Sequence, residues 1–126
     1  MSTQVETTKA QEVAHRLVDL CREGKNVDAI NELYDDNIVS IEPEGSPMAG
    51  KTAGKKAVLE STNQWFSSVE EIHSAYISDP MVSGNFFACT MDIDATYKEH
   101  GRNEMSELCV FEVNNGNIVT SQLFYN

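Results

Sequence analysis

The chain of 126 residues carries a net charge of -11, with nine lysines and arginines against twenty aspartates and glutamates, and 40% of its residues are hydrophobic. Nucleic-acid backbones and anionic membranes bind basic patches, so this charge argues against both as partners. No apolar run reaches the ~18 residues that cross a membrane, and the first residues lack the apolar core of a signal peptide. We therefore expect a cytoplasmic protein with a single domain over residues 1–126, in which residues 1–7 form a flexible tail.

Three cysteines, Cys21, Cys89 and Cys109, make an odd count without a CxxC motif or the Cys/His spacing of a zinc site. We expect reduced thiols that fill the core, and no bound metal. Cys109 is a poor candidate for a nucleophile, because the sequence places no histidine beside it to accept its proton.

The first half of the chain predicts three helices and one short strand. Apolar residues recur at helical spacing over residues 8–23, and Gly24 ends this helix. A second helix follows Asn26, which can cap it, and Ile38–Glu42 predicts a strand that stops before a proline. The third helix, which Thr52 can cap, has a buried stripe of Val58, Leu59, Thr62, Trp65 and Phe66.

From residue 67 onward the pattern changes to strands. Val69–Ser78 predicts one strand, on which the facing of His73 stays open, and residues 86–125 predict two consecutive antiparallel hairpins. Glu99-His100-Gly101 suits a three-residue loop, and Asn115-Gly116 suits a two-residue turn with positive φ at both positions. The predicted register places Ala95 opposite Met105, Ile93 opposite Glu107, Met91 opposite Cys109, Val113 opposite Ile118, Phe111 opposite Thr120, Cys109 opposite Gln122, and Glu107 opposite Phe124.

Because side chains alternate along a strand, this register predicts one apolar face that contains a single acid, Glu107. A buried carboxylate needs a partner or a raised pKa. Glu107 is therefore either an ion-paired structural residue or an acid in a pocket. The predicted apolar face consists of Phe87, Cys89, Met91, Ile93, Ala95, Tyr97, Met105, Glu107, Cys109, Phe111, Ile118, Thr120, Gln122 and Phe124.

Residues 45–52, GSPMAGKT, match the phosphate-binding pattern GxxxxGK[ST]. Pro47 removes one of the backbone donors that such a loop presents, and Glu42 and Glu44 would repel phosphate. The hairpins that follow also differ from the parallel strands, alternating with helices, of a nucleotide-hydrolysing core. We do not expect nucleotide binding.

The order of these elements resembles the nuclear transport factor 2-like superfamily, and within it the SnoaL-like group that includes ketosteroid isomerase and polyketide cyclases. The resemblance covers nearly the whole chain and implies an α+β fold, a cone-shaped barrel with three helices from the N-terminal half packed on a curved, mostly antiparallel sheet. Its landmarks are Arg16-Leu17-Val18, Gly24, Leu33-Tyr34-Asp35-Asp36, Glu42-Pro43-Glu44-Gly45-Ser46, Gly50-Lys51 and Asn115-Gly116-Asn117-Ile118-Val119.

In ketosteroid isomerase the general base is an aspartate directly before a proline, and the similar position here is Glu42, whose facing the short strand does not fix. The positions similar to the two groups that support the enolate in that enzyme are Leu17 and Cys109. Neither side chain can do that work, so the resemblance does not imply steroid isomerisation. The likeness to SnoaL-like cyclases implies acid/base chemistry without a metal or cofactor.

Two hypotheses of function remain. The first is a cofactor-free isomerase, cyclase or dehydratase that uses Glu42 and Glu107 as acid/base residues on a small apolar or carbonyl-containing molecule. The second is a non-catalytic pocket or association domain of the same fold. The candidate substrate-binding residues are Leu17, Trp65, Tyr97, Met105, Cys109, Phe111, Thr120, Gln122 and Phe124. The superfamily often dimerises through the outer face of its sheet, so we expect a homodimer through Leu108, Val110 and Leu123.

Overall fold

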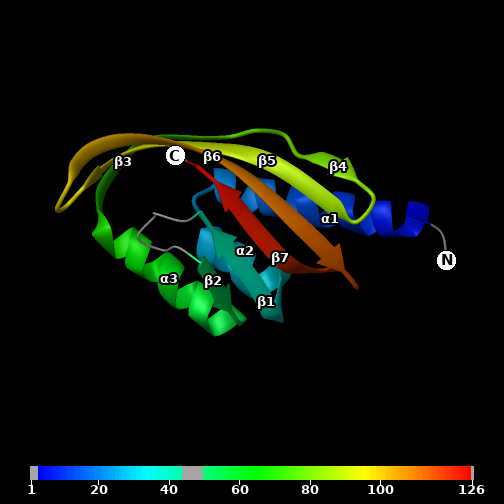
Figure 1. The fold of residues 1–126 in the computed structure, drawn as a ribbon. Helices are drawn as coiled ribbons and strands as arrows, with labels where there is room; N and C mark the ends of the chain where they lie inside the picture. Colours follow the sequence, from blue (N-terminus) through cyan, green and yellow to red (C-terminus); the bar gives the residue numbers. More distant parts are fainter. Residues whose placement is uncertain (1–2, 44–49, 126) are drawn as a thin grey trace.

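The computed structural model describes residues 3–43 and 50–125, with side chains from residue 9 onward. Figure 1 shows the helices gathered on one side of a curved sheet, with β3, β5 and β6 arching over them. The elements are α1 (Thr3–Arg22), α2 (Asn26–Leu33), β1 (Tyr34–Glu42), β2 (Gly50–Ala53), α3 (Lys55–Ser68), β3 (Val69–Ile77), β4 (Met81–Ser83), β5 (Phe86–Tyr97), β6 (Gly101–Asn114) and β7 (Asn117–Phe124).

Helix α1 begins earlier than predicted. It starts at Thr3, within residues 1–7, for which the sequence predicts a tail. The helix ends as predicted, where Gly24 takes a φ of 76° and the Lys25 N–H donates to the Leu20 carbonyl at 2.8 Å. Its buried face, with helical spacing, consists of Ala10, Val13, Ala14, Leu17, Val18, Leu20 and Cys21.

The strands form one sheet in the order β2-β1-β7-β6-β5-β3, and β4 pairs with β5 outside this order. Every pairing is antiparallel except that of β1 with β7, which is parallel. The edge strands β2 and β3 are not paired with each other in the described part of the chain, so the cone stays open and is not a closed barrel. Three helices on a curved, mostly antiparallel sheet confirm the predicted α+β class.

The first hairpin has a different register from the predicted one but the same faces. Gly101 takes the expected left-handed backbone at φ 74°, yet it pairs with Tyr97 as the first residue of β6. The loop is therefore Lys98-Glu99-His100, and Glu107 lies opposite Met91 instead of Ile93. Because the register differs by two residues, an even number, each side chain keeps its predicted face.

The second hairpin turns as predicted, with φ 53° at Asn115 and 82° at Gly116, and Val113 lies opposite Ile118. One step further a β-bulge follows, and Phe111 pairs with Ser121 in place of Thr120. An odd shift reverses the facing of the remaining strand. The predicted inward facing of Thr120, Gln122 and Phe124 is therefore wrong, and the residues that face the helices from β7 onward are Ile118, Ser121, Leu123 and Tyr125.

The segment before α3 is a strand, β2, that pairs with β1 through Glu42 and Gly50. The predicted cap at Thr52 is wrong, because α3 begins at Lys55 after Gly54, which has a φ of 95°. Lys51 and Thr52 lie within β2, so they do not form the loop-to-helix junction that a phosphate-binding motif needs. The earlier part of that motif, residues 45–49, lies outside the described residues.

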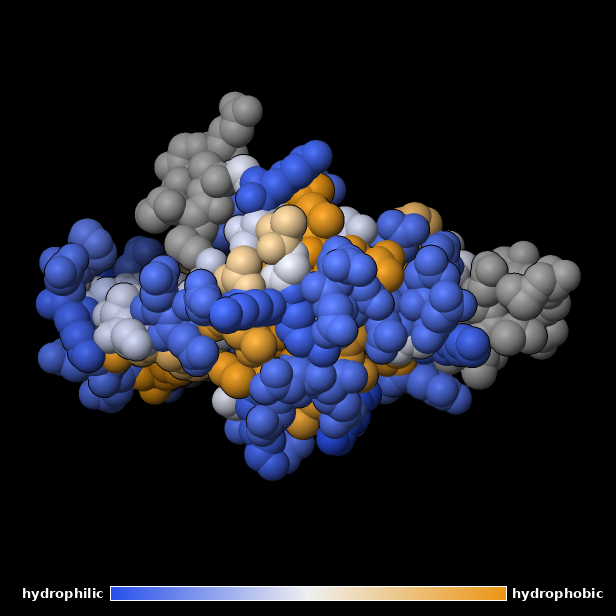
Figure 2. Space-filling view, turned by 90° about the horizontal axis from the view of Figure 1, so that it is seen from below, coloured by the Kyte–Doolittle hydropathy of each residue, from blue (hydrophilic) through white to orange (hydrophobic). Residues whose placement is uncertain are grey.

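The core lies between the concave face of the sheet and helices α1 and α2. At its centre the rings of Phe87 and Phe111 stack across β5 and β6 with centroids 4.7 Å apart. Figure 2 views the side of α2, α3 and β1, where hydrophobic residues gather in a band across a largely hydrophilic face. None of the helices in the described part of the chain is long and apolar enough to cross a membrane.

Candidate functional site

Glu107 lies on the concave face of β6, one residue before the point where β7 ends opposite Leu108. Its side chain is half-buried, and within residues 9–43 and 50–125 no donor or cation contacts its carboxylate. Burial, followed by the negative charge of Glu42, raises the pKa of Glu107 to about 7. This arrangement differs from the ion-paired structural role that the sequence left open.

Glu42 is the last residue of β1 and faces the same side of the sheet as Glu107. The alternation along β1, from the fully buried Ile38, puts Glu42 on the concave face. The Tyr125 hydroxyl donates a hydrogen bond to Glu42 Oε1 at 3.0 Å. Burial raises the pKa of Glu42, and the hydrogen bond from Tyr125 opposes this rise.

Two carboxyl groups that are far apart in sequence thus lie on the same face of the sheet, near the carboxyl end of β7, and interact electrostatically. Both share a weakly solvated environment, and the charge of Glu42 raises the pKa of Glu107. Such pairs separate into one group that stays ionised and one that stays protonated. An ionised carboxylate can accept a proton and a protonated one can donate it, which is the minimum that acid/base catalysis requires.

A pocket of about 360 Å³ opens beside Glu107, where β6 continues past the end of β7. Its polar lining residues are Thr90, Ser106, Glu107 and Tyr125. Leu108 and Phe124 form its apolar rim. Thr90, Ser106, Leu108 and Phe124 lie on the outer face of the sheet, so the pocket opens to that side, whereas the Glu107 side chain lies on the concave face.

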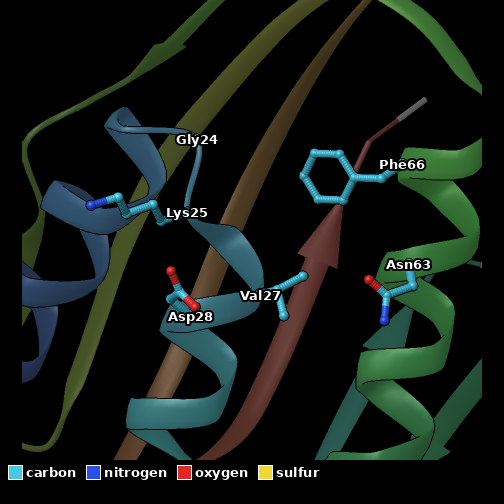
Figure 3. A pocket seen from close by; sticks show the side chains of 6 residues that line it. All are labelled: Gly24, Lys25, Val27, Asp28, Asn63 and Phe66. Carbon is cyan, nitrogen blue, oxygen red and sulfur yellow. The ribbon is translucent and has the colours of Figure 1, made fainter.

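A second pocket, of about 280 Å³, lies between α2 and α3. Figure 3 shows Phe66 and Asn63 of α3 facing Val27 of α2 across this pocket, while the Lys25 side chain points away from them. Among the described residues, Asp28 is the only carboxyl group that lines it. Neither Glu42 nor Glu107 lines this pocket, so it is distinct from the carboxyl pair.

Trp65, Tyr97 and Met105 lie on the inner side of the molecule, as predicted. The Trp65 and Tyr97 rings meet edge to face with centroids 6.2 Å apart. Burial raises the pKa of Tyr97, a hydrogen bond from Trp65 lowers it, and the charge of Glu107 raises it further. Met105 lies two residues before Glu107 on the same face of β6 and pairs with Ile93 of β5. The side chains of Met105 and Ile93 are half-buried.

Leu17, Cys109 and Phe111 are core residues. Their exposed fractions are 2%, 1% and 2%, so these side chains are not an accessible pocket lining. Thr120, Gln122 and Phe124 lie on the outer side of the sheet because of the bulge, and the structure does not bring the first two to the carboxyl pair. Phe124 reaches the pocket only at its outer rim.

The thiols are free and buried. Burial raises the pKa of Cys21 to about 12, and a hydrogen bond with Cys89 together with burial raises that of Cys109. The same hydrogen bond with Cys109 lowers the pKa of Cys89, against the effect of its burial. Cys21 and Cys109, whose pKa values are raised, are poor nucleophiles at neutral pH. Among the described residues, no three His, Cys, Asp or Glu side chains group as metal ligands would.

His73, whose facing the sequence left open, lies on the outer side of β3. Its Nε2 is 2.7 Å from the Thr96 hydroxyl, and its Nδ1 is 3.3 Å from Glu71. His73 therefore takes no part in the carboxyl pair.

Sequence reasoning missed Tyr125, which contacts one carboxyl and shares the pocket of the other. The sequence did not indicate that Tyr125 faces the core, because the predicted register, which has no bulge, turns this side chain to the outer side. The bulge is what brings it inward.

The chain matches the family model of the SnoaL-like domain over residues 8–125. A structure from Mesorhizobium loti, provisionally named a SnoaL-like polyketide cyclase with carbohydrate phosphatase as a second label, is 32% identical with a TM-score of 0.81, over 90% of this chain and 97% of its own. A Bacillus subtilis protein, provisionally named an isomerase, is 26% identical with a TM-score of 0.70, over 96% of this chain and 88% of its own.

A Catenulispora acidiphila protein with a ketosteroid isomerase-like fold, solved with trimethylamine, is 12% identical with a TM-score of 0.71 over 91% of this chain and 85% of its own, and it shows the fold alone. Among curated proteins no sequence matches. The family match spans nearly all of the chain, and the Mesorhizobium structure agrees with it in both sequence and fold. This protein belongs to the SnoaL-like domain family.

Proposed function

We propose that the protein binds a small carbonyl-containing molecule and acts on it as a cofactor-free isomerase, cyclase or dehydratase, with Glu42 and Glu107 as its acid/base residues. The observation that carries this proposal is the half-buried Glu107, which has no cation or donor in the described residues to explain it and which shares its surroundings with a second carboxyl group. A structural role would normally supply the partner that Glu107 lacks in this part of the chain.

The chemistry follows from the two protonation states. Ionised Glu42 removes a proton from the carbon next to the carbonyl, while protonated Glu107 donates its proton to the carbonyl oxygen. The product of this step is an enol, with Glu42 now protonated and Glu107 ionised. In a substrate with a carbon–carbon double bond next to that carbon, the product is a dienol. Glu42 then returns its proton to the far carbon and the enol hydroxyl returns its proton to Glu107, which completes an isomerisation and restores both carboxyl groups.

The charges around the pair favour a neutral or positively charged substrate. All nine lysines and arginines lie among residues 9–125, and in the described residues none contacts Glu42 or Glu107. Arg22, on the helix above the core, bonds the Ile77 carbonyl and Asp79. A carboxylate or phosphate on the substrate would meet only like charge here.

We assign substrate contacts to Tyr97, Met105 and Trp65, with Leu17, Cys109 and Phe111 as the apolar wall behind them. Half-buried aromatic and thioether groups suit an apolar ligand body. Phe124 is kept as a rim contact. Thr120 and Gln122 face the outer side of the sheet, so we assign them no contact with the substrate.

The proposed reaction is tested by exchange of the carbon-bound protons beside the carbonyl of cyclic ketones, followed by NMR in D₂O. We expect Glu107→Gln to reduce the exchange rate at least ~100-fold, the lower range for general acid catalysis. Glu104→Gln, at an exposed position of the same strand, is the matched control and should leave the rate unchanged.

If wild-type protein binds ketones but never exchanges their protons, the acid/base proposal fails. The protein would then be a non-catalytic binding domain, for which affinity should survive Glu107→Gln. The absence of strong hydrogen-bond donors at Leu17 and Cys109 is the observation that favours this second function.

We also propose a homodimer that forms through the outer face of the sheet. Leu108 and Phe124 pair across β6 and β7 on that face with exposed fractions of 43% and 46%. Leu123, expected in the same interface, faces the core instead. The three free thiols suit a reducing, cytoplasmic setting.

A further inference from the structure

Tyr125 contacts one of the two carboxyl groups and is a lining residue of the same pocket as the other. Tyr125 follows directly after β7, and Glu42 is the last residue of β1. Because the two strands pair in parallel, their carboxyl ends lie side by side. The Tyr125 hydroxyl donates to Glu42 Oε1 at 3.0 Å, while the same residue lines the pocket that contains Glu107. Glu42 thus has a hydrogen-bond donor, whereas Glu107 has none within the described residues.

We propose that Tyr125 is a positioning residue that keeps Glu42 as the ionised base and so leaves Glu107 as the proton donor. This inference rests on the proposed function and assigns the two roles within it. A hydroxyl that donates to a carboxylate stabilises the ionised form, because it gives up that bond or weakens it when the carboxyl is protonated. The charge retained on Glu42 then opposes ionisation of Glu107.

The other groups that face the pair do not reverse this assignment. Tyr97 on β5 and Cys89 and Cys109 on β5 and β6 are the titratable neighbours of Glu107, and all three are uncharged in their protonated forms. From α1, Arg22 is directed to Ile77 and Asp79 at the far edge of the sheet. In the described residues nothing positive competes with Tyr125 for Glu42.

The bulge in β7 gives this contact its geometric basis. Val119 is the extra residue between the pairs Val113–Ile118 and Glu112–Thr120. Without it, strand alternation would turn Tyr125 to the outer side of the sheet, and Glu42 would lose its donor. Bulges often re-aim a side chain next to a functional site, and here the side chain that is re-aimed is Tyr125.

The test is a carbon-detected NMR titration of the Glu42 and Glu107 carboxyls in ligand-free protein, with Tyr125→Phe as the variant. We expect Glu42 to titrate below Glu107 in the wild type. In Tyr125→Phe we expect the acid dissociation constant of Glu42 to fall roughly tenfold, as for loss of a hydrogen bond to a charged group. Tyr76→Phe, at an exposed tyrosine on β3, is the control and should leave Glu42 unchanged.

The inference is overturned if Glu42 titrates identically in wild type and Tyr125→Phe, or if Glu107 ionises first. A urea midpoint for Tyr125→Phe close to that of Tyr76→Phe shows that the altered titration does not come from a loosened fold. Should Tyr125→Phe unfold, Tyr125→Trp and its indole donor provide a second variant, which should hold Glu42 closer to the wild-type titration.

The ketone exchange reaction separates this inference from the proposed function. If both hold, the acidic limb of the rate profile against pH moves to higher pH in Tyr125→Phe, because Glu42 must lose its proton to act. If the titration changes as expected but no ketone exchanges, the positioning role stands and the acid/base function fails. If exchange occurs with an unchanged profile in Tyr125→Phe, the function stands and the positioning role is wrong.

Discussion

Glu107 holds its carboxyl group in a half-buried position where ionisation is unfavourable, which gives this residue a measurable effect on stability. Its pKa rises from 4.5 to about 7 on folding. Between these values the folded chain binds more protons than the unfolded chain, so stability falls as pH rises through this window and stays low above it. At about 1.4 kcal/mol per pKa unit, the loss has an upper limit of about 3.5 kcal/mol.

Replacing Glu107 with glutamine should therefore stabilise the protein only where the glutamate is ionised. We expect Glu107→Gln to raise the free energy of unfolding by about 1–3 kcal/mol at pH 8 and to change it by less than about 0.5 kcal/mol at pH 4.5. Urea unfolding at both pH values measures the difference. Glu104→Gln corrects for the general effect of lowering the net charge of -11. An equal change at both pH values would mean that Glu107 is solvated.

At the scale of elements, the bulge in β7 decides which side chains face the core. Ser121 is buried, with 3% of its surface exposed, and hydrogen-bonds Tyr34, whereas Gln122 faces outward from the next position. Apolar residues occur at both sets of alternating positions in β7, because Ile118 is followed by Val119 and Leu123 by Phe124. Alternation alone therefore could not choose between the two facings.

Lysine substitutions on either side of this choice test the bulge. Ser121→Lys places a charge in the core and should cost more than about 3 kcal/mol of unfolding free energy or prevent folding. Gln122→Lys should change it by less than about 0.5 kcal/mol, since that side chain faces solvent. Circular dichroism and urea unfolding of the two variants give the answer. If Gln122→Lys destabilises the protein more than Ser121→Lys does, β7 has the predicted register without a bulge.

At the scale of the whole molecule, the open sheet has two unlike faces. Within residues 3–43 and 50–125 the helices cover part of the concave face, whereas no helix covers the convex face, which carries the neighbouring Leu108 and Phe124. Exposed apolar pairs on a sheet face suit a self-complementary interface. Each subunit brings a net charge of -11, so association of two copies should be opposed by long-range repulsion.

Sedimentation equilibrium tests the dimer. We expect twice the chain mass of 14.0 kDa, with tighter association as salt screens the repulsion. Leu108→Glu should raise the dissociation constant at least ~10-fold, because it adds like charges to an apolar contact. Ile72→Glu, at an exposed apolar residue on the concave side of the edge strand β3, should leave it unchanged. A wild-type protein that sediments as a monomer refutes the interface.

The fold class, the concave faces of β5 and β6, and the presence of Glu107 among apolar neighbours could all be predicted from the order of the amino acids. These features rest on local signals: helical spacing, the left-handed backbone of Gly101, and the turn at Asn115-Gly116. The two-residue error in the first hairpin did no harm, because strand alternation has a period of two.

The groups that lie near Glu107 could not be predicted, because they come from strands that are distant in the chain. The facing of Glu42 depends on the parallel pairing of β1 with β7, a contact between residues far apart in the chain that no local pattern encodes. The inward position of Tyr125 depends on a bulge, which shifts a strand by one residue without needing a particular residue type at that point. The family could be inferred from the sequence, but the partners of its central acid are set by strand pairing over long range.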